Sequence, residues 1–208
     1  MTPIWKIKRE LERLKTQATA IPLAFYEPIL QRRYDPKRPQ LIKYIEGAIP
    51  AKDSLAIFLI FQTNEIPHSI FNTCKHLVSS GVAPIIISNA PLSKPDRLAL
   101  AKTAHIIAER PNFGYDFGGY RDGLWLINQI GLDPKKILFL NDSIWFPATE
   151  NNSLVGELFQ SGLDYTGVQI FDQKNKGNVR RSMIGSYCFA VNRRLLKSSE
   201  FIDFWENY

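Results

Sequence analysis

The sequence has few cysteines and histidines, and these shortages exclude several kinds of site. Its two cysteines, Cys74 and Cys188, form neither a zinc pattern nor a disulfide framework. We therefore expect buried free thiols in a protein of a reducing compartment. The three histidines, His68, His76 and His105, lack metal-ligand spacing, so we interpret them as structural. No GxSxG nucleophile elbow is present, which argues against Ser-His-Asp hydrolysis.

Long apolar segments are also missing. No window approaches the roughly 20 apolar residues that a membrane-spanning helix needs. The charged N-terminus has no apolar region of the kind found in secretory signal peptides, and we expect a cytoplasmic protein. A length of 208 residues suits one domain with a sizeable core and room for an appendage.

Positive charge is concentrated near the N-terminus. Residues 1–50 carry ten Lys or Arg against five acids, a balance of +5, and the whole chain has a net charge of +6. The difference of +1 belongs to residues 51–208, which are therefore nearly neutral. This distribution argues against a nucleic-acid-binding protein.

The first fifty residues are predicted to form a basic leader. Residues 4–17 have the apolar spacing of an amphipathic helix, and its basic residues suit peripheral contact with an anionic inner membrane face. A helix packed on its own domain or on a partner explains the same pattern. Five prolines punctuate residues 18–50, which predicts an irregular connection with a short helix near 40–46.

Residues 51–208 alternate between apolar runs and helical segments. The predicted strands span residues 55–61, 84–87, 105–108, 137–140, 165–171 and 187–191. The predicted helices span residues 68–80, 94–103, 124–130, 153–160 and 201–205, with a polar loop at 172–181. Such alternation favours a mostly parallel, doubly wound α/β sheet with right-handed crossovers. A chain that ends at Tyr208 within an apparent helix suggests a missing tail.

A glycine-rich turn, with Gly114, Gly118 and Gly119, follows the third predicted strand. Its spacing differs from the dinucleotide-binding fingerprint, and the P-loop lysine is absent. Polar side chains gather where the turn meets the next helix: Arg110, Asn112, Asp116 and Arg121. The arginines and the helix N-terminus suit contact with a diphosphate. A structural turn, in which Asp116 caps the helix and pairs with Arg121, explains the residues equally well.

A polar triplet, Asn141-Asp142-Ser143, ends the strand predicted at 137–140. Polar residues at the carboxyl end of a buried strand form ligand sites in open α/β sheets. Asp142, helped by Asn141 or Ser143, suits a divalent cation that a diphosphate also holds. For the triplet taken alone, an Asx-type turn is the favoured interpretation.

Four segments together carry a family resemblance: RPNFGYDFGGYRDGL, ILFLNDSIWFP, SYCFAVNRRLL and FIDFW. They resemble the rhamnan synthesis F family of bacterial polysaccharide glycosyltransferases, over about residues 54–208. The resemblance implies a Rossmann-like sheet of the GT-A type. It also implies a transferase that uses dTDP-L-rhamnose or a similar donor to extend a cell-surface glycan, with a glycan or lipid-linked glycan as acceptor.

On this resemblance, the triplet stands where such folds carry a metal-binding Asp-x-Asp motif. Asn at the first position and Ser at the third depart from that motif, so binding of Mg or Mn by Asp142 and binding of the diphosphate by arginines both stay open. The strand end at Ser88-Asn89 is expected to border the base and ribose. The predicted donor-binding residues are Thr63, Asn64, Arg110, Asn112, Gly114, Asp116, Gly119, Arg121, Asn141 and Ser143.

An inverting transfer needs a general base on the acceptor side, usually a carboxylate. Asp172, in the predicted polar loop, is the first candidate, and Glu200 and Asp203 are alternatives; Asp142 is the predicted catalytic metal ligand. A rival interpretation is a non-catalytic domain that binds a sugar nucleotide or a glycan. Turnover of the donor separates the two.

Overall fold

The computed structural model describes residues 29–149, 151–174 and 180–208, without the side chains of residues 171–174 and 180–182. The chain divides into two compact units, residues 1–41 and 42–208. The described part of the first unit contains a short 3-10 turn η1 (Asp35–Lys37) and helix α2 (Arg38–Leu41). The helix predicted over residues 4–17 lies outside the described residues, so its membrane contact stays a prediction. Within the described residues, every helix is too short or too polar to cross a bilayer.

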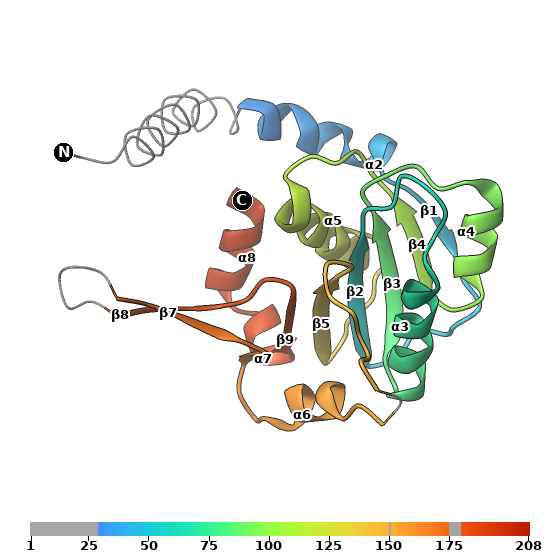
Figure 1. Ribbon diagram of the computed structural model, residues 1–208. Coiled ribbons are helices and arrows are strands. Elements are labelled where there is room, and N and C mark those ends of the chain that lie inside the picture. Colours follow the sequence, from blue (N-terminus) through green and yellow to red (C-terminus); the bar gives the residue numbers. More distant parts are fainter. Residues whose placement is uncertain (1–28, 150, 175–179) are drawn as a thin grey trace, which may run out of the picture. The chain divides into compact units, whose positions relative to one another are not determined.

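The second unit is a mixed seven-stranded sheet with helices on both faces (Figure 1). The strands of this sheet are β1 (Lys43–Glu46), β2 (Ser54–Ile60), β3 (Ala83–Ser88), β4 (Ile106–Glu109), β5 (Lys136–Asn141), β6 (Tyr165–Gly167) and β9 (Cys188–Asn192). The helices are α3 (His68–Ser79), α4 (Lys94–Ala101), α5 (Tyr115–Gln129), α6 (Leu154–Gln160), α7 (Arg193–Leu196) and α8 (Ser199–Asn207). Strands β7 (Ile170–Lys174) and β8 (Arg180–Ile184) form a separate antiparallel hairpin.

The strand order is β1-β4-β3-β2-β5-β9-β6. The four central strands, β2 to β5, are parallel, as the sequence predicts. The outer strands pair antiparallel, β1 with β4 and β9 with both β5 and β6. The chain winds outward from β2 through β3 to β4 and then returns to place β5 on the other side of β2. Strands β2 and β5 therefore flank the topological switch point, where open α/β sheets bind ligands.

Three local predictions are wrong. Residues 43–46 form edge strand β1 and not part of a helix. The strand predicted over 165–171 is split into β6 and the start of β7, and the polar loop that follows belongs largely to the β7–β8 hairpin. An edge strand and a two-stranded ribbon are partly exposed to solvent and need no continuous apolar run. Their polar composition therefore gives no strand pattern in the sequence.

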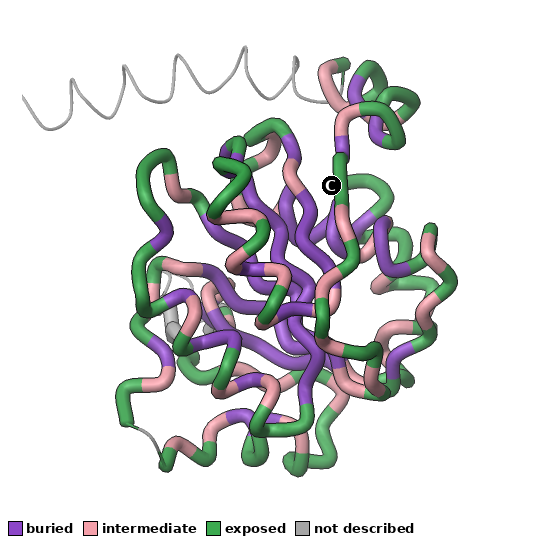
Figure 2. The backbone as a smooth tube through the Cα atoms, turned by 90° about the vertical axis from the view of Figure 1, so that its right-hand side faces the viewer, coloured by how far each residue is buried: buried purple, intermediate pink, exposed green. Residues whose placement is uncertain are grey.

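The core lies on both faces of the sheet, as a continuous apolar run in β2 predicts. Alternate side chains of β2 point to opposite faces: Ala56, Phe58 and Ile60 pack with α3, α4 and α6, whereas Leu55, Ile57 and Leu59 pack with α5 and α8. Figure 2 shows the buried backbone concentrated in the central strands. Both cysteines are free and buried, as predicted, and burial raises the pKa of each thiol to about 12.

Candidate active site

The carboxyl ends of the four parallel strands meet at one edge of the sheet, which we call the carboxyl edge. It contains the strand ends Phe61-Gln62, Ser88-Asn89, Glu109-Arg110 and Asn141-Asp142. Because β9 runs antiparallel to β5, its first residues lie at the same edge. The β7–β8 hairpin joins the end of β6 to the start of β9, so it also leaves from the carboxyl edge.

Asp142 connects the two strands at the switch point. Its Oδ2 accepts hydrogen bonds from the Phe61 backbone N–H at 2.8 Å and from the Gln62 side-chain amide at 2.7 Å. Its own backbone N–H donates to the Leu59 carbonyl at 3.0 Å. The half-buried carboxylate is thus held in place by the end of β2. Gln62 was not among the predicted site residues.

Asn141 connects the polar triplet to the glycine-rich turn. Its side-chain amide donates to Asp116 Oδ2 at 2.7 Å. Its Oδ1 accepts from the Ser143 backbone N–H at 3.3 Å and from the Ser143 hydroxyl, which is the geometry of an Asx turn. The triplet therefore forms the predicted Asx turn. Through its bond to Asp116, Asn141 also holds the first turn of α5 against the end of β5.

Asp116 and Asp142 both affect the pKa of the Tyr120 hydroxyl. Tyr120 is fully buried in α5, and its hydroxyl donates to the Ser186 carbonyl at 3.0 Å. Burial raises the pKa of Tyr120, and the charges of Asp116 and Asp142 raise it further. The glycine-rich turn and the triplet, about 25 residues apart along the chain, thus contribute negative charge to one region of the carboxyl edge.

Glycines allow α5 to lie unusually close to the sheet. A Cβ on Gly119 would come 2.3 Å from Leu59 Cδ1, and one on Gly123 would come 2.8 Å from Ile57 Cγ2. Gly119, a predicted donor-binding residue, therefore lies against β2. Gly114 begins the helix with a φ of 70°, and the exposed Tyr115 has a φ of 49°. This left-handed turn directs the start of α5 toward the carboxyl edge.

Gly118→Ala is expected to lower the free energy of unfolding by about 2–3 kcal/mol through overpacking. A Cβ at this position would come 2.1 Å from the Phe113 carbonyl oxygen, a backbone atom that cannot swing away. Urea denaturation measures the loss. The matched control is Gly156→Ala in α6, where a Cβ meets only the end of the Gln160 side chain at 4.0 Å. Because alanine favours a helix more than glycine does, the free energy of unfolding of this variant should rise by about 0.5–1 kcal/mol. Equal changes in the free energy of unfolding for the two variants would contradict the close approach of Gly118 to the Phe113 carbonyl oxygen.

Both predicted phosphate-binding arginines have partners inside the protein. Arg110 donates to Asp122 Oδ2 at 2.5 Å, to Asn89 Oδ1 at 2.6 Å and to the Phe113 carbonyl. The side chains of Arg110 and Asp122 are only 1% and 2% exposed. The ion pair therefore joins the end of β4, the end of β3, the glycine-rich turn and α5.

Arg121 does not pair with Asp116 as the structural interpretation proposed. It donates to the carbonyls of Trp205 at 2.7 Å and Glu206 at 3.0 Å. These carbonyls belong to the last turn of α8, where the helix leaves its C=O groups without backbone partners. Arg121 therefore fixes the C-terminal end of α8 against α5.

The other predicted residues differ in their surroundings. Thr63, Asn64 and Asn112 are exposed in the loops after β2 and β4. Ser88 is buried and donates to the Ala90 carbonyl at 2.6 Å. Asp172 lies in β7, but its side chain is outside the described residues. The alternatives Glu200 and Asp203 lie on α8 and are exposed.

Few groups at the carboxyl edge are suited to hold a metal ion. Within the described residues, no three His, Cys, Asp or Glu side chains gather as a metal site. His105 contacts the Ile49 carbonyl at 2.9 Å through Nδ1, and His76 packs edge-on against Phe146. A cation at this edge would depend on Asp142 and on oxygens from the ligand itself; Asp116 is hydrogen-bonded to the adjacent Asn141.

A hollow of about 270 Å³ lies elsewhere, beside edge strand β1. Its lining residues are Lys43, Tyr44, Ile45, Arg97, Ile107 and Glu109. Two of its ionic groups are already engaged, since Arg97 pairs with Glu109 at 2.5 Å and Glu109 also accepts from the Leu92 backbone N–H. We therefore place the candidate site by its polar groups at the switch point, and not by the size of this hollow.

Comparison with known proteins is consistent with the motifs. Residues 84–208, which include the glycine-rich turn and the triplet, match the family described as rhamnan synthesis protein F. The chain is 32% identical over 200 residues to the uncharacterized protein y4gN of Sinorhizobium fredii (strain NBRC 101917 / NGR234). That alignment covers 96% of this chain and 52% of the relative, so the chain spans about half the length of the curated protein that it matches.

Proposed function

The chain belongs to the rhamnan synthesis protein F family, and on that premise we propose that it is a glycosyltransferase of polysaccharide synthesis. In this proposal the domain has a GT-A-like role and transfers a sugar, rhamnose first among the candidates, from a nucleotide-diphosphate donor. The acceptor is a growing cell-surface glycan, free or lipid-linked. The reaction is an inverting transfer at the inner face of the cell membrane.

One observation carries the proposal: two carboxylates, Asp142 and the Asn141-bound Asp116, lie at the carboxyl end of β5, beside the switch point of a parallel sheet. Asp142 is held by hydrogen bonds from the end of β2, and Asp116 is held by Asn141 at the start of α5. Ligand sites of open α/β sheets lie at this position. The backbone N–H groups at the start of a helix attract anions, so the diphosphate is proposed to lie over the first turn of α5.

The charge of this edge favours a divalent cation as the partner of the diphosphate. Asp116 and Asp142 are acidic, and both arginines of the motif have internal partners. A diphosphate beside two carboxylates needs positive charge between them. Mg²⁺ or Mn²⁺ requires only one or two protein carboxylates when substrate phosphates supply further oxygens. When bound, such an ion would neutralise the charge that develops on the departing diphosphate.

The general base is proposed to come from the β7–β8 hairpin. This hairpin leaves the carboxyl edge between β6 and β9 and contains Asp172. In an inverting transfer a carboxylate on the acceptor side accepts the proton of the attacking hydroxyl. Its position beyond the strand ends makes Asp172 the first candidate over Glu200 and Asp203.

The donor is expected to stabilise the protein only when a divalent cation is present. A ligand that binds only the folded state raises the free energy of unfolding by about 2.7 kcal/mol at 100 times its Kd. Thermal denaturation with dTDP-L-rhamnose and Mn²⁺ should therefore show a higher Tm, and addition of EDTA should abolish the increase. An equal increase in EDTA would contradict the role of the cation.

A second candidate function is a non-catalytic domain that binds a sugar nucleotide. The triplet supplies one carboxylate, because its first and third residues are Asn141 and Ser143, and no group of three metal-ligating side chains lies within the described residues. Donor hydrolysis separates the candidates. Donor-dependent stabilisation without hydrolysis or transfer, with Mg²⁺ or Mn²⁺ supplied, would favour the binding domain.

A further inference from the structure

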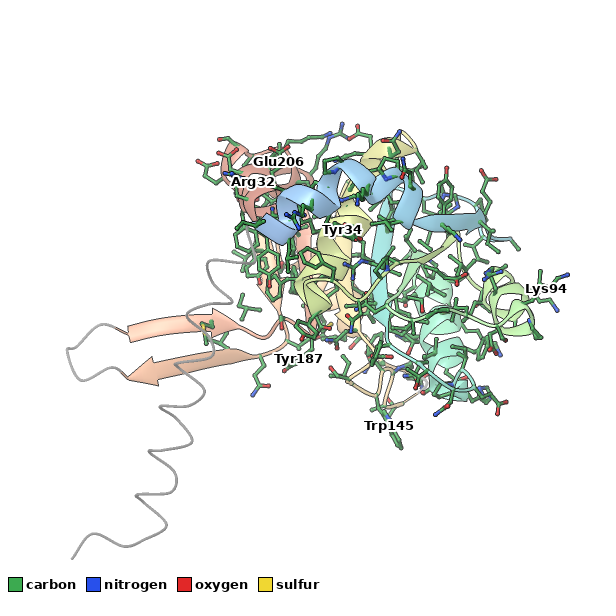
Figure 3. The ribbon with its side chains drawn as sticks, turned by 90° about the horizontal axis from the view of Figure 1, so that it is seen from above. Arg32, Tyr34, Lys94, Trp145, Tyr187 and Glu206 are labelled. Atoms are coloured by element: carbon green, nitrogen blue, oxygen red, sulfur yellow. The ribbon has the colours of Figure 1, made fainter. Side chains whose placement is uncertain are left out.

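Trp145 is a large hydrophobic residue that the fold leaves in solvent. Its side chain is 88% exposed, the highest value among the large hydrophobic residues that the structure describes. Figure 3 shows it pointing away from the body of the protein. An exposed tryptophan beside a polar site suits a binding surface, because its broad ring offers a large apolar contact.

The segment that carries Trp145 is held on both sides. Three residues earlier, Asp142 accepts hydrogen bonds from the end of β2. The next residue, Phe146, is only 6% exposed, and its ring packs edge-on against His76 with centroids 5.1 Å apart. The Phe146 carbonyl also accepts from the Thr73 hydroxyl. The indole is therefore presented by a fixed segment, which reduces the entropy lost when a ligand binds.

Trp145 and the proposed donor site lie on different sides of Asp142. Asp116 belongs to α5, which covers one face of the sheet, whereas Phe146 packs with α3 on the other face. Asp142 lies at the sheet edge between them. Three residues of extended chain span at most about 11 Å, so the indole is within reach of a short oligosaccharide whose end lies at Asp142.

The charge of the segment favours a neutral ligand. Residues 141–153 contain no Lys or Arg and include Asp142 and Glu150. In the absence of a cation, phosphate groups and anionic lipids are bound by clusters of basic residues, so residues 143–153, which follow the proposed cation ligand Asp142, suit neither. A sugar ring has an apolar C–H face that an indole can cover, and hydroxyl groups that can reach Asp142 and the exposed Ser143.

We propose that Trp145 binds the acceptor glycan by stacking on a neutral sugar ring and so directs an acceptor hydroxyl toward the donor sugar at the carboxyl edge. The proposal rests on the proposed function, because it assigns Trp145 to the acceptor half of the same site. Trp145 is a positioning residue here, and its loss acts on acceptor binding.

Trp145→Ala is expected to raise the KM for a neutral rhamnose trisaccharide by about tenfold or more, comparable to the loss of one aromatic stacking contact. The kcat at saturating acceptor, donor hydrolysis and donor-dependent stabilisation should change little. Trp145→Phe should recover most of the loss. Leu98→Ala, which truncates a 54% exposed side chain on α4, is the matched control and should leave the KM unchanged.

Acceptor binding is also measurable without turnover. The trisaccharide should change the tryptophan fluorescence of the wild type and not that of Trp145→Ala, which keeps this test valid if the chain lacks transferase activity. An unchanged KM and an unchanged titration would overturn the proposal. Two other results for Trp145→Ala would also overturn it. Loss of donor-dependent stabilisation would assign Trp145 to the donor. If the variant lost only its binding to anionic vesicles, Trp145 would be assigned to the membrane.

Discussion

Asp142→Asn is expected to lower the rate of sugar transfer by about 100-fold, because loss of a group that supports a metal site or stabilises transition-state charge costs about 10- to 1,000-fold. The substitution removes the negative charge and keeps a side-chain oxygen that can still accept from the Phe61 N–H and the Gln62 amide. The fold should therefore stay intact. Steady-state transfer from dTDP-L-rhamnose, with Mn²⁺ supplied, measures the effect.

The control for this prediction is Asp53→Asn. Asp53 precedes β2 and so lies at the opposite edge of the sheet, where its exposed side chain pairs with Lys135 at 2.7 Å. This variant should transfer sugar as the wild type does. Asp142→Ala should lose activity as well, and its Tm should show the additional cost of the hydrogen bonds it gives up. Full activity in Asp142→Asn would reject the assignment of Asp142 to the site.

Asp122→Ala is expected to destabilise the protein by about 3–5 kcal/mol. The change leaves the Arg110 guanidinium buried without its carboxylate partner, and an uncompensated buried charge of this kind carries a cost of that size. The pair is almost fully shielded from water, with side-chain exposures of 1% and 2%. Urea denaturation, followed by circular dichroism, measures the change in the free energy of unfolding.

A double substitution tests the origin of this cost. Arg110→Met with Asp122→Leu removes both charges and fills the space with apolar side chains, so it should recover most of the stability that Asp122→Ala loses. The double variant should still lose donor binding, because Arg110 also holds Asn89 and the Phe113 carbonyl beneath the turn. The comparison is with Asp53→Asn, which breaks the exposed ion pair with Lys135. If Asp122→Ala lowers the free energy of unfolding no more than Asp53→Asn does, the burial of the charge has no energetic consequence.

The sequence predicted the centre of the fold because hydrophobic runs determine it. Strands β2 and β5 are buried on both faces, so their apolar residues are continuous and easy to recognise. The sequence also predicted that the glycine-rich turn after β4 and the polar triplet after β5 lie at one edge of the sheet. The hydrogen bond between Asn141 and Asp116 is the direct consequence, since both segments begin where parallel strands end.

The roles of the arginines were not accessible from the sequence. Arg110 is buried because Asp122, Asn89 and the Phe113 carbonyl converge on it, and such a convergence depends on three-dimensional packing. A charged side chain within a glycine-rich turn has the same local pattern whether it binds phosphate or closes a buried ion pair. The glycines were ambiguous for the same reason: Gly119 and Gly123 are required by the closeness of α5 to β2.

Gln62 and the proposed glycan-stacking residue Trp145 gave no signal of their own in the sequence. Gln62 follows an apolar strand and adjoins the predicted Thr63, but its bond to Asp142 links residues 80 positions apart. Trp145 lies between Ile144 and Phe146, and in the sequence it looks like a third core residue. Only the structure shows that Phe146 packs inward while Trp145 remains in solvent.

The position of the donor is measured most directly by NMR with paramagnetic Mn²⁺. We predict that Mn²⁺ together with dTDP broadens the backbone N–H signals of Phe61 and Asp142 and the side-chain amide of Gln62, and that Mn²⁺ or dTDP alone does so much less. Broadening confined to Lys43 and Tyr44, at the hollow beside β1, or unchanged signals at all of these positions, would contradict a donor site at the switch point.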